Sequence, residues 1–223
     1  MNSSKKLGEL KRLGLSRKNQ CYPGYFNIGD FHDGGYESEF VSPYTNTAGN
    51  IHSPIMILLQ DWASADKLSG VFDKESAKLG YNPSLPTNKN LSLLLKSTFD
   101  LKLSEVFVTN VFPYVKPGKM SASIPQRDLN TAFKDFCLPQ INILAPDLVI
   151  CCGKPAFESV KKYFCPAYES KSKVNDYFKV DKTIYYYQRH PSPVSINRNG
   201  GIKRAVDDWG QMKNFWEKVK KQK

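Results

Sequence analysis

Three polar side chains follow apolar runs in this chain, and together they can do complementary chemistry. They are Asp61, Asn110 and His190. A carboxylate can hold and polarise a water molecule, and an amide presents a donor beside an acceptor, which matches the edge of a pyrimidine such as uracil. A histidine can donate a hydrogen bond to an oxygen that gains negative charge as a bond breaks. Any one of the three alone would be an ordinary structural residue, but the combination indicates a functional site.

The elements that must position these residues are apolar runs of strand length that alternate with helical patterns. Continuous apolar runs are typical of strands covered on both faces. Strands are expected at 54–59, 105–108, 147–151 and 183–187, and helices at 90–99, 125–144, 154–163 and around 209–216. This alternation predicts an α/β fold, a three-layer α/β/α sandwich with a central, mostly parallel four-stranded sheet. Chemistry in open parallel sheets collects at the carboxyl ends of strands, which is where the three polar residues stand.

A proline-stiffened loop follows the last strand. It reads His190-Pro191-Ser192-Pro193-Val194-Ser195, and Gly200-Gly201 separates it from the final helix. Two prolines fix φ, so the nearby hydroxyls and amides hold a set direction without being ordered on binding. Such a loop suits gripping a phosphate backbone while the histidine reaches past it. A lone histidine in a surface turn is the alternative, and the other two strand ends weigh against it.

Length and charge limit the classes of protein. The 223 residues predict a single domain over 1–223, with 1–53 as an irregular basic and aromatic N-terminal extension packed on it. A short helix or a frayed arm is expected near 7–13. The net charge of +11 predicts an acidic partner. The lysines concentrate at both ends, where such runs are usually solvated tails, so charge alone leaves nucleic-acid binding open.

The chain contains no apolar run long enough to span a membrane, and no signal peptide is recognisable. Five cysteines without metal-finger spacing suit reduced thiols, so a cytoplasmic protein with no structural metal and no membrane partner is expected. Cys151 and Cys152 are expected to pack as small hydrophobes at a strand end.

These motifs, in this order, resemble the uracil-DNA glycosylase superfamily. The segment from His190 to Ser195 is similar to the leucine-loop motif HPSPLS, and Gln60-Asp61 resembles the start of the water-activating motif GQDPYH. Asn110 resembles the strand-end asparagine that reads uracil, and residues 145–156 are similar to the third-strand signature of the superfamily. The resemblance covers about residues 54–216, and the histidine loop is its most specific part.

The resemblance implies a uracil-DNA glycosylase-like fold and a monofunctional DNA glycosylase. Such an enzyme hydrolyses the N-glycosidic bond of uracil, and of other deaminated bases in some members, and leaves an abasic site. Asp61 would position the water that attacks C1′ of the flipped nucleotide, and His190 would stabilise the departing base at O2. Gln60, Trp62 and Asn110 would bind the base.

The base would also stack on an aromatic ring. Phe72 is the preferred candidate for that ring, and Tyr81 is the alternative. Val194 would enter the duplex in place of the flipped base. The further DNA contacts implied by the resemblance come from Ser64, Pro191, Ser192, Pro193, Ser195 and Arg198. Lys203 and Arg204 would either add charge to this surface or face bulk solvent.

The chain departs from the family pattern at three points. Trp62-Ala63 stands where the motif has Pro-Tyr, so either Trp62 blocks the methyl group of thymine or the pocket is wider. Val194 is one methylene shorter than the leucine of the motif. Some members carry an iron–sulfur cluster, but only Cys137 falls near such a position and no CxxC pair exists, so no cluster or other cofactor is expected.

The expected partner is uracil-containing DNA, single- or double-stranded, and the protein is expected to be a monomer. One rival is a catalytically weak DNA-binding member that acts as a uracil sensor or processivity subunit, but binding alone would not require Asp61. A second rival is a hydrolase of free nucleosides or nucleotides. The stiff serine loop and the +11 charge weigh against it, because a small ligand needs neither.

Overall fold

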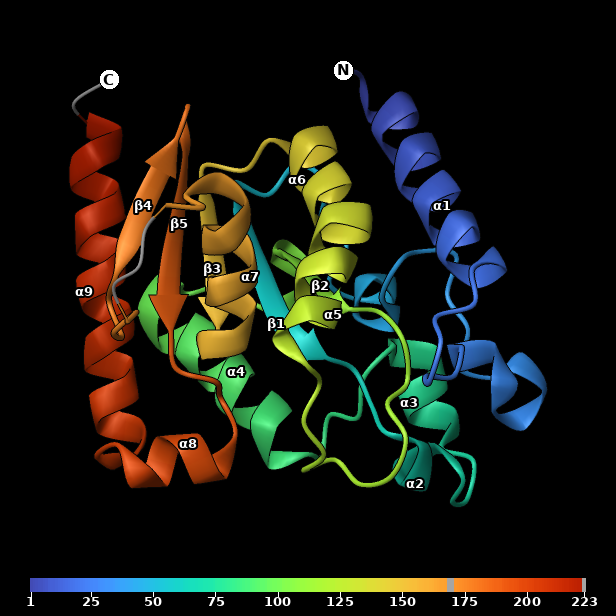
Figure 1. Ribbon diagram of the computed structural model, residues 1–223. Helices are drawn as coiled ribbons and strands as arrows, with labels where there is room; N and C mark the ends of the chain where they lie inside the picture. The colour runs from blue at the N-terminus through green and yellow to red at the C-terminus, as the bar shows by residue number, and fades with distance from the viewer. Residues whose placement is uncertain (168–170, 222–223) are drawn as a thin grey trace.

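A five-stranded sheet forms the centre of the protein in the computed structural model, which describes residues 1–167 and 171–221 (Figure 1). The strands are β1 (Ile55–Asp61), β2 (Phe107–Phe112), β3 (Leu148–Cys152), β4 (Tyr177–Val180) and β5 (Thr183–Gln188). Their order is β2-β1-β3-β5-β4, and each neighbouring pair is parallel except β4 with β5.

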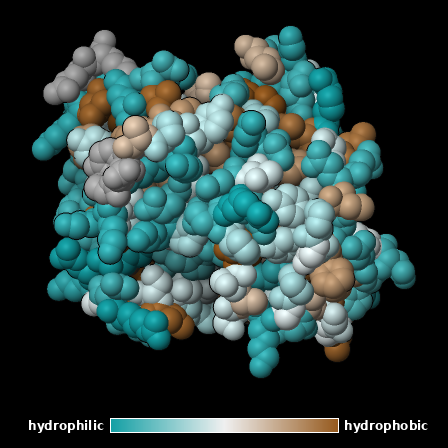
Figure 2. Space-filling model, viewed as in Figure 1, coloured by the Kyte–Doolittle hydropathy of each residue, from teal (hydrophilic) through white to brown (hydrophobic). Residues whose placement is uncertain are grey.

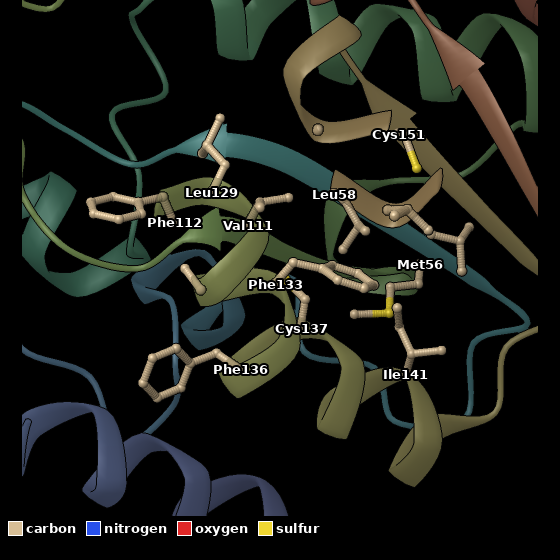
Figure 3. Close-up of a cluster of buried hydrophobic side chains, with 14 of the residues drawn as sticks. Met56, Leu58, Val111, Phe112, Leu129, Phe133, Phe136, Cys137, Ile141 and Cys151 are labelled. Atoms are coloured by element: carbon tan, nitrogen blue, oxygen red, sulfur yellow. The ribbon is translucent and has the colours of Figure 1, made fainter. Parts of the chain in front are cut away.

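Helices cover both faces of the sheet, which confirms the predicted α/β/α layering. One face packs against α4 (Pro86–Phe99), α8 (Pro193–Arg198) and α9 (Gly201–Lys221). The other face packs against α5 (Gln126–Ala132), α6 (Leu138–Leu144) and α7 (Lys154–Phe164). Successive side chains of a strand point to opposite faces. Met56 and Leu58 of β1 therefore join the α5–α7 side (Figure 3), whereas Ile57 and Leu59 join the α4–α9 side.

The prediction of four strands was one short, because β4 lacks the apolar run that marks the others. β4 is an edge strand in which Tyr177 and Lys179 are exposed and Phe178 and Val180 are half-buried. It pairs antiparallel with β5, and Phe178 stacks on Tyr185 with ring centroids 5.0 Å apart. An edge strand half in solvent needs only every second residue apolar, and four residues are too few to reveal that alternation.

The helix expected over 125–144 is present, but it is not uniform. A π-helical turn, Phe133–Cys137, lies between α5 and α6. Pro139 is the second residue after this turn, and a proline neither donates a hydrogen bond to the carbonyl four residues earlier nor fits against it. The wider turn accommodates that ring while Phe133, Phe136 and Cys137 all stay in the core.

The connection over 65–88 contains two short helices, α2 (Ala65–Leu68) and α3 (Lys74–Leu79). Asp73 caps α3 by accepting a hydrogen bond from the backbone N–H of Ser76 at 3.0 Å. Gly80 ends it in the left-handed conformation, at φ 79°, and packs against the carbonyl of Pro43.

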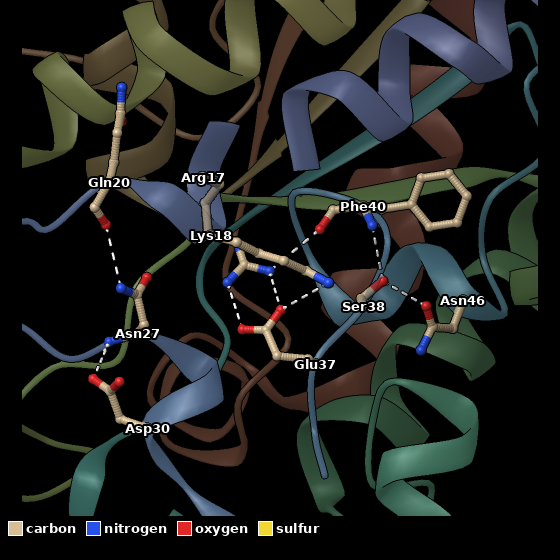
Figure 4. A network of polar contacts seen from close by, with 9 residues as sticks. All are labelled: Arg17, Lys18, Gln20, Asn27, Asp30, Glu37, Ser38, Phe40 and Asn46. Atoms are coloured by element: carbon tan, nitrogen blue, oxygen red, sulfur yellow. Dashed lines mark hydrogen bonds and ion pairs between the residues drawn. The ribbon is translucent and has the colours of Figure 1, made fainter. Parts of the chain in front are cut away.

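The N-terminal region opens with a regular helix, α1 (Ser3–Asn19), which is longer than the short helix expected near 7–13. The buried guanidinium of Arg17 holds both carboxylate oxygens of Glu37 at 2.7 and 2.8 Å (Figure 4). Gly14 lies so close to the carbonyl of Glu39 that a Cβ atom would come within 2.1 Å of its oxygen. Residues 20–53 follow with only short 3-10 turns, η1 (Ile28–Asp30), η2 (His32–Gly34) and η3 (Pro43–Asn46).

Candidate active site

Two of the three predicted polar residues lie on the same face of neighbouring strands. Asp61 ends β1 and lies opposite Phe112 of β2, and Asn110 lies opposite Leu59. Asn110 therefore stands two residues inside β2 rather than beyond its end. Side chains two residues apart share a face, so Asp61 and Asn110 both point to the side covered by α4 and α9.

His190 reaches the same edge from β5, which is separated from β1 by β3. Gly153 ends β3 at φ 102°, and a Cβ atom there would lie 3.4 Å from the Cβ atom of His190. The glycine thus turns the chain sharply at the point where His190 passes over the end of β3. The charge of Asp61 acts on the pKa of His190, which places both residues in one electrostatic environment.

The carboxylate of Asp61 is held at both oxygens. Its Oδ1 accepts a hydrogen bond from Gln60 Nε2 at 2.9 Å, and its Oδ2 forms an ion pair with Lys116 Nζ at 2.9 Å. The two charged side chains are 9% and 4% exposed. Lys116 also donates to the carbonyl of Met120 at 2.7 Å. The amide of Gln60, expected to bind a base, is directed to Asp61 in this conformation.

Sequence reasoning missed Lys116. The only signal for it was a single lysine in the loop after β2, near the same strand edge, among 32 lysines and arginines of the chain. Its backbone forms a parallel bridge with Ser64, which brings the loop against the residues that follow β1. Lys116 is recognisable as the charge partner of Asp61 only once its bridge with Ser64 is known.

The imidazole of His190 is arranged as a neutral donor. Its Nδ1 accepts a hydrogen bond from the backbone N–H of Ser192 at 3.2 Å, which leaves the ring proton on Nε2. Burial lowers the pKa of His190, the charge of Asp61 raises it, and the charge of Lys116 lowers it, with a net shift downward. At neutral pH the ring therefore presents an N–H donor at Nε2 and carries no charge.

Asn110 is fully buried, and its side-chain NH2 group makes no hydrogen bond to the described residues. Its Oδ1 accepts a hydrogen bond from the hydroxyl of Ser42 at 2.6 Å, and its backbone carbonyl accepts one from the thiol of Cys137 at 3.3 Å. Its Nδ2 finds no acceptor among the residues that the structure describes. A buried amide N–H without a partner is costly, and this one is available to donate a hydrogen bond to a ligand.

The segment after His190 is a short helix rather than the expected loop. Ser192 caps α8 by accepting a hydrogen bond from the backbone N–H of Ser195 at 3.4 Å, and Pro193 occupies the first helical turn. The carbonyl of Pro191 accepts a hydrogen bond from Asn90 Nδ2 of α4 at 2.9 Å, which anchors the segment. Val194 stands out from it, 60% exposed. Arg198, at its end, is also exposed.

Ser64 and Arg204 both have carboxylate partners within the protein. Ser64 is fully buried and donates its hydroxyl to the carboxylate of Asp66, so the structure does not present it to a phosphate. Arg204 pairs with Asp208 at 3.2 Å. Asp208 is almost completely buried and also holds Arg189, the residue before His190, at 3.3 Å.

The aromatic residues of the 62–81 region contact the N-terminal region and neighbouring backbone. Phe72, the ring expected to stack on a base, is half-buried and lies 4.9 Å from Tyr36 and 5.3 Å from His32, measured between ring centroids. The indole N–H of Trp62 donates to the carbonyl of Gly80 at 2.8 Å. Tyr81 stacks parallel on Tyr44 at 5.6 Å.

A family model for the uracil DNA glycosylase superfamily matches residues 44–220, which is most of the chain. The chain belongs to the uracil DNA glycosylase superfamily. A search of curated proteins returned no match. Superfamily membership supports a glycosylase-type hydrolase that acts on DNA, with a general role in base excision repair. Asp61, Asn110 and His190 all lie within the matched range.

Three further features concern membrane spans, the surface and metal binding. Among the described helices, none has both the length and the apolar character that a membrane span requires. The face shown in Figure 2 is largely hydrophilic, with apolar residues in small scattered groups. Within residues 1–167 and 171–221, no three His, Cys, Asp or Glu side chains gather in a metal-binding arrangement.

Proposed function

We propose that this chain is a monofunctional uracil-DNA glycosylase. It hydrolyses the bond between uracil N1 and C1′ of the sugar and leaves an abasic site. The observation that carries the proposal is the arrangement at one strand edge of a fixed carboxylate, a neutral imidazole donor and a buried amide whose donor is unused. The family match supports the same reaction class.

Asp61 positions the attacking water. Gln60 and Lys116 fix the rotation of its carboxylate, so a water bound to it is held in one direction toward C1′. The water oxygen forms the new bond to C1′, and its proton passes to the carboxylate. The bonding electrons leave with the base, whose O2 gains negative charge.

His190 stabilises that charge. Its Nε2–H is already oriented, because the backbone N–H of Ser192 fixes the ring through Nδ1. A preorganised donor aimed at developing charge is worth about 100-fold or more in rate. A neutral donor is enough here, because uracil is a good leaving group once its anion accepts one hydrogen bond.

Asn110 reads the base. Its Nδ2–H donates to O4 of uracil, and the second lone pair of its Oδ1 accepts from N3–H. We assign Trp62, held by Gly80, to the pocket wall that faces C5 of the base. Val194 enters the base stack from α8, and Ser192, Ser195 and Arg198 contact the DNA backbone around it.

The test is single-turnover cleavage of uracil-containing oligonucleotides, with abasic sites revealed by alkaline cleavage. We expect wild-type protein to act on uracil in single-stranded and duplex DNA, and to leave free uridine and matched thymine-containing DNA unchanged. His190→Gln should slow cleavage by about 100-fold or more while the protein still binds DNA. Cleavage of free nucleosides, or specific uracil-DNA binding without any release of base, would contradict the proposal.

A further inference from the structure

The first 43 residues lie outside the family match, yet this region supplies a direct contact to the proposed base reader. Ser42 is fully buried, and its hydroxyl oxygen lies 2.6 Å from Oδ1 of Asn110. We propose that Ser42 determines base specificity by holding the amide of Asn110 in the orientation that reads uracil rather than cytosine. This inference rests on the proposed role of Asn110.

The direction of the hydrogen bond between the two residues is set by the local backbone. Ser42 precedes the 3-10 turn η3 and caps it, because its Oγ accepts from the backbone N–H of Tyr44 at 3.3 Å. The hydroxyl proton therefore points away from that N–H and toward Asn110. In the structure this proton is donated to the carbonyl oxygen Oδ1, and Nδ2 lies on the side that has no partner among the described residues.

The orientation of the Asn110 amide matters because its carbonyl and NH2 groups have nearly the same shape. Reversing the amide keeps the shape of the site but exchanges the hydrogen-bond donor and acceptor. Uracil offers an acceptor, O4, beside a donor, N3–H, whereas cytosine offers a donor, N4–H, beside an acceptor, N3. The observed amide matches uracil, and the reversed amide would match cytosine. The position of the backbone offers no discrimination, because β2 and the thiol of Cys137 hold it in either case.

Ser42 penalises the reversed amide. Turning Asn110 over would replace Oδ1 by an NH2 group, so the hydroxyl proton of Ser42 would lose its acceptor in a site without solvent access. A buried donor left without an acceptor shifts an equilibrium by about tenfold or more. Without the hydroxyl, both orientations become available and the preference for uracil falls.

The experiment measures base preference without turnover. Single-stranded oligonucleotides carry either 2′-fluoro-deoxyuridine or 2′-fluoro-deoxycytidine at one position, because the fluorine slows glycosidic cleavage. The ratio of the two dissociation constants is measured for wild type, Ser42→Ala, Ser42→Thr and Thr45→Val. Thr45 is the matched control, since its buried hydroxyl comes from the same turn but donates to the backbone carbonyl of Val108 at 3.1 Å.

We expect wild type to prefer the uracil analogue and Ser42→Ala to lose about tenfold of that preference. Ser42→Thr keeps the hydroxyl and should retain it, and Thr45→Val should retain it as well. An unchanged ratio in Ser42→Ala, an equal loss in Thr45→Val, or a wild type without preference would each overturn the role of Ser42.

Cleavage of uracil-DNA by the same proteins separates this inference from the proposed function. A wild type that prefers the uracil analogue but releases no base would refute the hydrolase while leaving the role of Ser42 intact. Normal cleavage together with an unchanged ratio in Ser42→Ala would refute only the role of Ser42.

Discussion

Asp61 and Lys116 give the site a buried ion pair whose two members depend on each other. Both side chains are almost inaccessible to solvent. Removing one charge leaves the other buried without compensation, which typically costs about 3–5 kcal/mol, whereas removing both costs far less. At this position a catalytic effect and a stability effect are therefore superimposed, and single substitutions report their sum.

A double-mutant comparison separates the two effects. Asp61→Asn should lower the free energy of unfolding by about 3 kcal/mol and slow uracil excision by about 100-fold or more. Adding Lys116→Met should restore most of the stability and none of the rate. Urea denaturation and single-turnover cleavage of the wild type and the two variants provide the measurements. Recovery of cleavage in the double variant would show that Asp61 acts only as the partner of Lys116.

The lowered pKa of His190 predicts how the stability of the protein depends on pH. The folded pKa of this residue lies below the unfolded value of 6.5, so above that pH both states are neutral and the stability contribution is complete. As the pH falls below 6.5, the unfolded state takes up a proton first, so stability is lost progressively toward the lower folded pKa. Wild type should therefore lose stability relative to His190→Gln as the pH falls from 6.5 toward the lower folded pKa of His190.

NMR titration checks the assignment directly, because the chain has only three histidines and His190→Gln removes one resonance. Activity should persist below pH 6.5, since the neutral ring is the donor. A histidine titration at or above 6.5 that disappears in His190→Gln would contradict the burial argument.

At the scale of elements, α8 carries one exposed apolar side chain, Val194, which we propose enters the duplex. Val194 fills less of the space left by a flipped base than leucine would, and the missing methylene is worth about 0.8 kcal/mol. We therefore expect faster excision from single strands or opposite guanine than opposite adenine, where unstacking is hardest. Val194→Leu should narrow this gap by about fourfold, as measured by single-turnover cleavage of the three substrates.

Leu15→Val on α1 is the control for Val194, because it removes one methylene at a similarly exposed position, 57% against 60%. It should leave all three rates unchanged. Equal wild-type rates on the three substrates, with no response to Val194→Leu, would place the wedge elsewhere.

The elements also show what sequence patterns can and cannot predict. A buried strand is recognisable in the sequence as a continuous apolar run. The sequence therefore predicts β1, β2, β3 and β5, and with them the sheet edge that carries Asp61 and His190. The half-exposed β4 could not be predicted in this way. Ser42 and Lys116 were missed because a polar contact across 68 residues, such as that of Ser42 with Asn110, leaves no periodicity in the sequence. Phe72 was chosen by residue type as a stacking ring, and its contacts with Tyr36 and His32 could not be predicted from the sequence.

At the scale of the molecule, three ion pairs fix α1 to the segment that follows it: Arg17 and Lys18 pair with Glu37, and Lys11 pairs with the exposed Glu39. Burial raises the pKa of Glu37, but the hydrogen bond and charge of Arg17, with Lys18, outweigh it and hold the pKa below 4.5. Stability from this carboxylate is complete above pH 4.5 and is lost as the pH falls through the lower folded pKa. Lys11 and Glu39 form the exposed pair at 2.8 Å.

Glu37→Gln should lower the free energy of unfolding by about 3 kcal/mol, because Arg17 is left buried without a counter-charge. For a chain of this length that corresponds to a fall in Tm of roughly 6–12 °C. Glu39→Gln at the exposed pair should change Tm by about 2 °C or less. Differential scanning calorimetry compares the two variants, and equal effects would show that burial of the pair contributes nothing.

The buried and the exposed cysteines differ in chemical reactivity. Cys137, Cys151 and Cys152 are buried, and burial raises the pKa of each thiol, to about 12 for Cys152. Thiolate is the form that reacts with peroxide and alkylating agents, so these interior sulfurs stay inert at neutral pH. Cys21 is exposed and Cys165 is partly so. Oxidants and thiol-reactive dyes therefore modify the outside of the protein first, which makes Cys21 a position for a fluorescent label that leaves the core intact.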